Sequence, residues 1–163
     1  MPKGIVLKRG QEFLTRGDPS ILVNGINVAQ KFWASDNESF YNHAGIIVSD
    51  KGDTFEALWK LDHYNLDQRI GDEVLIVERL DLTPEMIEKG IKAVEKYDGV
   101  RYPILRLPLH LLHLAKFIHW KYPVCSELTA KYEYEMGVRQ QWWGIMPDNL
   151  ADEGKISRYY KII

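Results

Sequence analysis

Short apolar runs separated by turn residues fill much of the chain's first half, and this pattern predicts a sheet. Residues 44–48 read AGIIV, a continuous apolar run typical of a strand buried on both faces. The turn residues SDKG follow at 49–52, and residues 53–59 form a second strand pattern, so the two runs predict a β-hairpin. Residues 74–77, VLIV, predict a third strand. Shorter patterns predict further strands at 5–8, 12–15 and 158–163.

Two later segments combine helical periodicity with residues that start and stop helices. Thr83 is a predicted N-cap with Pro84 at the first helical position, and Gly99 is the predicted stop. Residues 125–136 predict a second helix with one apolar stripe, ended by Gly137. The chain therefore carries at least two well-delimited helices after its main group of strands.

The order of these elements predicts an α+β fold, in which an antiparallel sheet packs against helices. Within the second helix, Glu127 and Lys131 have the i,i+4 spacing of a surface ion pair. Residues 26–33 predict one more short helix. A length of 163 residues, with no repeat or Gly/Ser linker, predicts a single domain covering residues 1–163.

Composition removes several classes of function. Hydrophobic residues make up 45% of the chain and charged residues 27%, which is typical of a folded soluble domain. The formal charge of -2 gives no basic excess, so we expect no nucleic-acid partner. The single cysteine, Cys125, excludes an intrachain disulfide and a multi-cysteine metal site. The N-terminus lacks the apolar core of a signal peptide, so we expect a cytoplasmic protein. A viral or phage protein is compatible with this expectation.

The most apolar segment spans residues 104–121, beginning at Ile104 and ending at Lys121. It is shorter than the roughly 20 apolar residues of a membrane span and contains charges and three histidines, so we do not expect it to cross a bilayer. It has apolar residues on two sides of a predicted helix, which leaves two interpretations. The helix is buried by Trp142 and Trp143, or it contacts a membrane, an apolar substrate or a second subunit.

Cys125 is the candidate nucleophile. Pro123 cannot lie inside a helix, so Cys125 falls at the start of the helix that follows. Free backbone N–H groups and the helix dipole at that end favour a thiolate, which is the reactive form of cysteine. The same N–H groups can stabilise an oxyanion. The alternative is an inert buried cysteine, the common role of a lone cysteine in such a domain.

A cysteine nucleophile needs a base, and the base needs an orienting group. His43 precedes the strand at 44–48, where rigid backbone would hold its ring. If the hairpin has a four-residue loop, Glu56 lies opposite Gly45 on the partner strand. Because side chains alternate along strands, Glu56 and His43 then share a face as diagonal neighbours. A two-residue loop would keep the shared face but move the two apart.

Two rival constellations remain to be compared with this one. Three histidines before Cys125 offer zinc ligands together with it, although their spacing matches no common zinc motif. These histidines are His110, His113 and His119. Trp142 and Trp143 offer a stacking surface for a sugar or a base, or they fill the core.

The order of the three candidate residues resembles that of the circularly permuted papain-like cysteine hydrolases. The motif NHAGIIV at 42–48 comes first, FEA at 55–57 follows, and CSEL at 125–128 comes last. The likeness is to the YiiX/YebB-like branch of the NlpC-type superfamily, whose relatives include lecithin:retinol acyltransferase-like proteins and a poxvirus group. The segments GQEFLTRG at 10–17, YDGVRY at 97–102 and MPDNL at 146–150 are also similar to the family. The long apolar segment before the cysteine is a departure from it.

By this resemblance Cys125 is the nucleophile, His43 the base and Glu56 the orienting acid. Tyr102 would line the site. Tyr102 and Ser126 are the candidates for contacts with the substrate or the oxyanion. The reaction implied is acyl transfer from a peptide, amide or lipid-acyl substrate, as in a cysteine peptidase or amidase, with no metal and no cofactor.

A second hypothesis belongs to another class of function. The same fold can serve as a non-catalytic binding or structural module, for instance in a virus particle or at a membrane. The presence of cysteine, histidine and glutamate together favours the enzyme, because a binding module needs none of the three. The reactivity of the Cys125 thiol near neutral pH distinguishes the two hypotheses.

Overall fold

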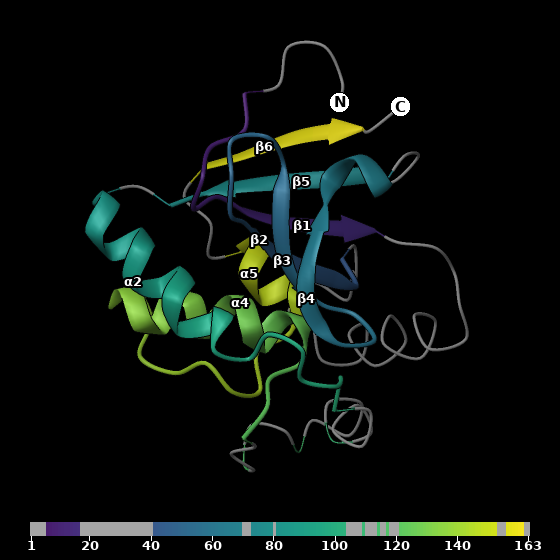
Figure 1. The fold of residues 1–163 in the computed structure, drawn as a ribbon, viewed down its shortest axis with the longest axis vertical. Helices are drawn as coiled ribbons and strands as arrows, with labels where there is room; N and C mark the ends of the chain where they lie inside the picture. The colour runs from purple at the N-terminus through teal and green to yellow at the C-terminus, as the bar shows by residue number, and fades with distance from the viewer. Residues whose placement is uncertain are drawn as a thin grey trace.

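The described part of the chain forms one antiparallel sheet with helices packed against it, an α+β arrangement (Figure 1). A computed structural model describes residues 6–16, 41–69, 73–79, 81–103, 121–152 and 156–161, and positions 109, 114 and 117. The strands are β1 (Glu12–Arg16), β2 (His43–Ile47), β3 (Asp53–Ala57), β4 (Leu61–Asn65), β5 (Glu73–Glu78) and β6 (Ile156–Lys161). Their order in the sheet is β4-β3-β2-β1-β5-β6. The helices are η1 (Leu66–Arg69), α2 (Pro84–Glu95), α4 (Cys125–Met136) and α5 (Pro147–Asp152).

Most of the predicted strands are confirmed, with small shifts in their ends. The hairpin is β2 and β3, and its register pairs Gly45 with Glu56, as a four-residue loop requires. The predictions at 12–15 and 74–77 correspond to β1 and β5, and the closing strand is β6. The predicted strand at 5–8 is wrong over residues 6–8, where Leu7 instead packs its side chain against Phe13 and Ile47. The sequence pattern also missed β4, whose inward and outward residues alternate less clearly.

Both predicted helices are confirmed, as are the N-cap of the first and the terminal glycine of the second. The Thr83 side chain accepts a hydrogen bond from the Met86 N–H, and Pro84 is the first helical residue of α2. Helix α2 ends at Glu95, before the predicted stop at Gly99. Helix α4 ends at Gly137, whose φ of 82° is the left-handed conformation that favours glycine at this position. Helix α5 was not predicted; the predicted helix at 26–33 and most of segment 104–121 lie outside the described residues.

Apolar clusters cover both faces of the sheet, which explains the continuous apolar run of β2. On one face, Ile46 and Phe55 pack beneath α2 and α4, against Ile91, Leu128 and Tyr132. A second cluster on this side includes Leu14, Ala44, Leu75, Ala130, Trp142 and Leu150. On the other face, Phe13, Ile47, Val74 and Ile76 form a separate cluster with Leu7 and Leu66. Figure 1 shows α2 and α4 side by side against the sheet.

The predicted ion pair between Glu127 and Lys131 is wrong. Glu127 is fully buried, and its carboxylate accepts hydrogen bonds from the backbone N–H groups of Val124 and Gly144. Lys131 pairs instead with Glu135, one turn further along α4. The i,i+4 rule describes side chains on a solvent-exposed helix surface, whereas Glu127 is buried beneath the loop at 142–146, whose Gly144 N–H it accepts.

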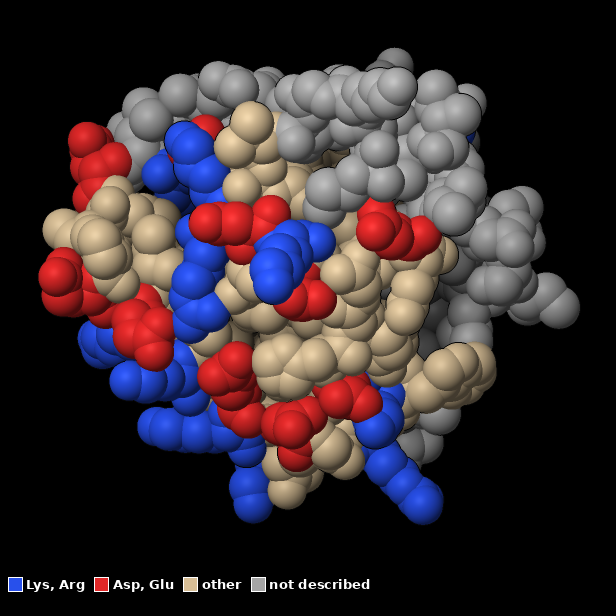
Figure 2. Space-filling model, turned by 45° about the horizontal axis from the view of Figure 1, so that its top comes forward, with Lys and Arg blue, Asp and Glu red and all other residues tan. Residues whose placement is uncertain are grey.

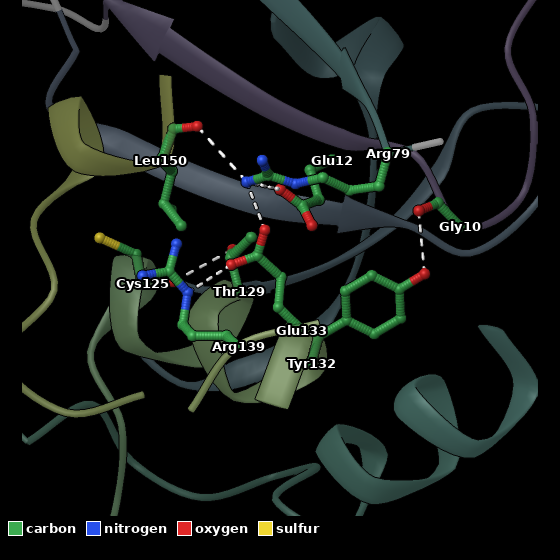
Figure 3. Close-up of polar contacts among 9 residues, drawn as sticks. All are labelled: Gly10, Glu12, Arg79, Cys125, Thr129, Tyr132, Glu133, Arg139 and Leu150. Atoms are coloured by element: carbon green, nitrogen blue, oxygen red, sulfur yellow. Dashed lines mark hydrogen bonds and ion pairs between the residues drawn. The ribbon is translucent and has the colours of Figure 1, made fainter. Parts of the chain in front are cut away.

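A buried charge cluster ties the middle of α4 to the sheet (Figure 3). Glu133 pairs with Arg79 through one carboxylate oxygen and with Arg139 through the other, the latter at 2.6 Å. Arg79 also reaches Glu12 in β1 and the Leu150 carbonyl in α5, both at 3.4 Å. Burial, and then the charge of Glu133, raise the pKa of Glu12 well above its usual value. The cluster therefore joins β1, the end of β5, α4 and α5 at a single point.

Charged side chains of both signs are interspersed on the face shown in Figure 2. The positive and negative charges that nearly balance in the sequence are therefore also mixed among the described residues on this face. In the described part of the chain, every helix falls short of the length and apolar character that crossing a bilayer requires.

The charge cluster generates a prediction about stability. Replacing Glu133→Gln should lower the free energy of unfolding by about 3–5 kcal/mol, because two buried arginines then lose their shared carboxylate. Urea unfolding at neutral pH measures the change. The matched control is Glu135→Gln on the same helix, where the partly exposed pair with Lys131 contributes less than about 1 kcal/mol. Equal losses in the two variants would contradict this account of the cluster.

Candidate active site

The hairpin places His43 and Glu56 on one face of the sheet. Glu56 lies directly opposite Gly45, and His43 is two residues before Gly45 on β2, so their side chains point the same way. His43 Nε2 and Glu56 Oε2 are 2.7 Å apart, a hydrogen bond between two buried side chains. The structure therefore brings these two predicted site residues together as the hairpin register implied.

The Glu56 carboxylate has polar partners at both oxygens. It is fully buried, and Oε1 accepts a hydrogen bond of 2.5 Å from the Thr54 hydroxyl while Oε2 faces His43. A buried carboxylate is tolerated only with such compensation, and the two contacts also fix its orientation. Thr54 was missed from sequence, although its position two residues before Glu56 puts it on the same face of β3.

Cys125 lies on the side of His43 away from Glu56. It is the first residue of α4, it is 7% exposed, and its interaction with His43 lowers the pKa of its thiol. Because Nε2 of His43 faces Glu56, the ring nitrogen left for the cysteine is Nδ1. His43 thus stands between the thiol and the carboxylate, and the three predicted residues form one connected row.

The site favours a thiolate over a thiol. Burial on its own raises the pKa of Cys125, but the hydrogen bond and the charge of His43 lower it, and backbone N–H groups of Ala44 and Ser126 lower it further. The net result is a pKa below the usual value of 9.0. The Ala44 N–H is a contribution that no sequence motif reveals, because it depends on where α4 meets β2.

His43 is correspondingly held in its protonated form. Burial lowers the pKa of His43, and the hydrogen bonds and negative charges of Cys125 and Glu56 reverse that effect and raise the pKa from 6.5 to about 9. The imidazolium of His43 and a thiolate at Cys125 therefore stabilise each other. The Phe13 ring, with its centroid 6.2 Å from that of the imidazole, packs beside it.

Tyr102 interacts with Cys125, the candidate nucleophile, next to which the resemblance predicted it to lie. Its pKa is raised well above the usual 10, first by burial and then by the negative charge of Cys125, with which it hydrogen-bonds. The Tyr102 hydroxyl therefore keeps its proton and is available as a donor. Its backbone N–H donates to the Trp59 carbonyl at 3.0 Å, and the Trp59 side chain, which was not predicted as a site residue, is 80% exposed.

Ser126 contributes its backbone rather than its hydroxyl. The hydroxyl donates to the Ile145 carbonyl at 2.6 Å, while the backbone N–H of Ser126 faces the Cys125 thiol. The side chain is thus occupied by a contact with the neighbouring loop. Of the polar groups of Ser126, the backbone N–H is the one that acts on the Cys125 sulfur.

The two alternative sites, a histidine zinc site and a tryptophan stacking surface, fare differently in the structure. His110, His113 and His119 lie outside the described residues, and the described residues contain no cluster of potential metal ligands. Trp142 is buried in the core beside Ala130 and Leu150, and Trp143 packs against it edge to face. Of the segment at 104–121, the described positions Leu114 and Phe117 are exposed.

No family model, curated protein or solved structure matches the chain. The site is therefore interpreted from its own geometry.

Gly45 generates a prediction about the His43–Glu56 contact. A Cβ at Gly45 would lie 2.6 Å from the Phe13 ring and 2.9 Å from Glu56 Cγ, so Gly45→Ala should displace Glu56 from His43. We expect the apparent pKa of Cys125, measured by the pH dependence of iodoacetamide alkylation, to rise. Gly90→Ala is the control, because its Cβ would meet Tyr132 at 2.6 Å in the α2–α4 interface, away from His43. Thiol titrations that move equally in both variants would count against the proposed role of the hairpin.

The ion pair generates a prediction about pH. The ring of His43, followed by NMR, should titrate near pH 9 in the wild type, and at lower pH in Cys125→Ala, because the thiolate no longer favours the imidazolium. His43→Gln should move the alkylation midpoint of Cys125 upward, since burial then acts on the thiol without an opposing charge. Superimposable alkylation profiles of wild type and His43→Gln would refute the pairing.

Proposed function

We propose that this chain is a cysteine-nucleophile hydrolase or acyl-transfer enzyme whose triad is Cys125, His43 and Glu56. The observation that carries the proposal is His43, whose Nε2 lies 2.7 Å from Glu56 and whose interaction with Cys125 lowers the pKa of the thiol. A nucleophile, a base and an orienting acid in one row is the arrangement that covalent acyl transfer requires.

Acylation begins with attack of the Cys125 thiolate on a substrate carbonyl carbon. A C–S bond forms, and the carbonyl π electrons move to the oxygen, which becomes an oxyanion. When the tetrahedral intermediate collapses, the bond to the leaving group breaks, and His43 gives its proton to the departing amine or alkoxide. The thioester that remains is the acyl-enzyme.

Deacylation reverses these roles with a different nucleophile. His43, now neutral, takes a proton from water or another acceptor, whose oxygen or nitrogen attacks the thioester carbon. The C–S bond breaks and the thiolate is restored beside the imidazolium. Protons and electrons balance within the triad and the substrate, so the proposed reaction uses no metal or cofactor.

In this proposal, the backbone N–H of Cys125 and the Tyr102 hydroxyl stabilise the oxyanion. The backbone N–H of Cys125 lies at the start of α4, where N–H groups have no helical partner. The Tyr102 hydroxyl hydrogen-bonds with Cys125 and stays protonated. Donors aimed at a developing charge in a buried site account for a large share of catalysis in acyl transfer.

The proposed fold family is the circularly permuted papain-like group of the NlpC-type superfamily. Support comes from the chain order, in which the strand that begins at His43 precedes the helix that begins at Cys125, and from the antiparallel sheet against which that helix packs. The substrate within this proposal is a peptide, an amide or a lipid-acyl compound. A non-catalytic module on the same fold is the outcome that a failed acylation test would favour.

The test of the proposed function is the formation of the acyl-enzyme. Incubation with p-nitrophenyl acetate should release p-nitrophenol and leave one acetyl group on Cys125, detected by mass spectrometry. Cys125→Ala should abolish both signals, and Glu56→Gln should slow acylation about 10–100-fold because it weakens the group that orients His43. Glu85→Gln in the exposed first turn of α2 is the control.

The opposite result would be a wild-type protein that gains no acetyl group and whose thiol alkylates with the pH profile of free cysteine. That outcome would replace the enzyme with the non-catalytic module.

A further inference from the structure

Glu127, two residues after the proposed nucleophile, is a buried carboxylate that the proposed mechanism leaves without a role. It is fully buried, and its two oxygens accept different backbone N–H groups. Oε2 accepts from Val124 at 3.3 Å, and Oε1 accepts from Gly144 at 2.7 Å. One side chain therefore joins the residue before the nucleophile to a loop much later in the chain.

The neighbouring Ser126 also binds this loop, but as a hydrogen-bond donor, whereas Glu127 is an acceptor. Its hydroxyl donates to the Ile145 carbonyl at 2.6 Å, next to the Gly144 N–H that Glu127 accepts. Gly144 has a φ of 73°, so the loop bends sharply at the point where it is held. Two adjacent side chains of the nucleophile turn thus fix two adjacent backbone groups of the loop at 142–146.

Glu127 also affects Tyr102, the candidate oxyanion donor. Its negative charge is among the causes that raise the pKa of Tyr102, after burial and the contacts with Cys125. The carboxylate thus contacts the start of α4 and the loop at 142–146, and its charge also acts on the candidate oxyanion donor.

We infer that Glu127 is a positioning residue of the active site, which holds the cysteine turn and the loop at 142–146 in one fixed geometry around the reacting sulfur. This inference rests on the proposed function for its catalytic meaning. Acyl transfer depends on placement to within a fraction of an ångström, and a displacement of about 1 Å costs roughly 100-fold in rate. If the turn that carries Cys125 could move relative to Tyr102, the sulfur would lose its position in the site, even though His43 and Glu56 stayed paired.

The chemistry of a carboxylate suits this role better than that of an amide. A carboxylate has an acceptor at each oxygen and can take both N–H groups, whereas glutamine has a single acceptor oxygen and presents N–H donors at the other end. Glu127→Gln therefore keeps one of the two contacts, and Glu127→Ala keeps neither. The two variants form a graded series with little change in the rest of the helix.

The experiment compares Glu127→Gln and Glu127→Ala with the wild type, using p-nitrophenyl acetate as the probe. We expect kcat to fall about 10-fold in the glutamine variant and about 100-fold in the alanine variant, with KM changed less than about 3-fold. The matched control is Glu135→Gln in the same helix, where Glu135 pairs with Lys131. It should leave kcat and KM unchanged.

A second measurement reports on the loop independently of catalysis. Hydrogen exchange of the Gly144 amide, followed by NMR, should be slow in the wild type and fast in Glu127→Ala, because that N–H loses its acceptor. The alkylation midpoint of Cys125 should stay below that of His43→Gln in both Glu127 variants, since His43 and Glu56 remain in place. A protein that was merely destabilised would instead show a midpoint shifted toward that of an ordinary cysteine.

The outcomes separate this inference from the proposed function. Loss of Gly144 protection with an unchanged kcat overturns the inference and leaves the enzyme intact. A wild type that forms no acyl-enzyme removes the proposed function, and the inference is then decided by the rate of iodoacetamide alkylation of Cys125 at saturating pH. An unchanged rate in Glu127→Ala overturns it, and a rate reduced several-fold in Glu127→Ala but not in Glu135→Gln upholds it.

Discussion

The contact on which the site depends is the close approach of β2 and β3 at Gly45 and Glu56. Because Gly45 has no Cβ, the stem of Glu56 can cross the face of the hairpin and bring its carboxylate to 2.7 Å from His43. The carboxylate holds the imidazole in position, and its charge favours the imidazolium that in turn stabilises the Cys125 thiolate. The lowered pKa of Cys125 thus depends on the missing side chain of Gly45, which lets Glu56 reach His43.

Helix α4 presents Cys125 to this pair, and buried polar groups fix it at both ends. Near its start, Glu127 accepts the N–H groups of Val124 and Gly144. Near its end, Glu133 lies between Arg79 and Arg139. Apolar packing alone would tolerate small slides of a helix over a sheet, whereas these charged and directional contacts allow only one position. The placement of Cys125 and the stability of the fold are therefore linked through the same helix.

The predictions from sequence succeeded where a local rule decides the structure. The hairpin register that puts Glu56 opposite Gly45 depends on loop length, and the start of α4 at Cys125 depends on Pro123 nearby. They failed where burial decides. Glu127 has the spacing of a surface ion pair with Lys131, yet the loop at 142–146 covers it, and its partners become backbone N–H groups. Likewise, the hydroxyl of Ser126 is engaged by Ile145, which no pattern near Ser126 foretells.

By itself the sequence determined the types of most elements, the shared face of His43 and Glu56, and the position of Cys125 at a helix start, because these follow from backbone periods and caps within a few residues. Only the tertiary structure decided that α4 meets β2 at the end where His43 lies, so that the Ala44 N–H and the imidazole both reach the sulfur. It also decided that Tyr102 lies beside Cys125 with its proton retained. These juxtapositions join segments far apart in the chain, and they depend on how apolar faces and buried charges pack, which no local pattern encodes.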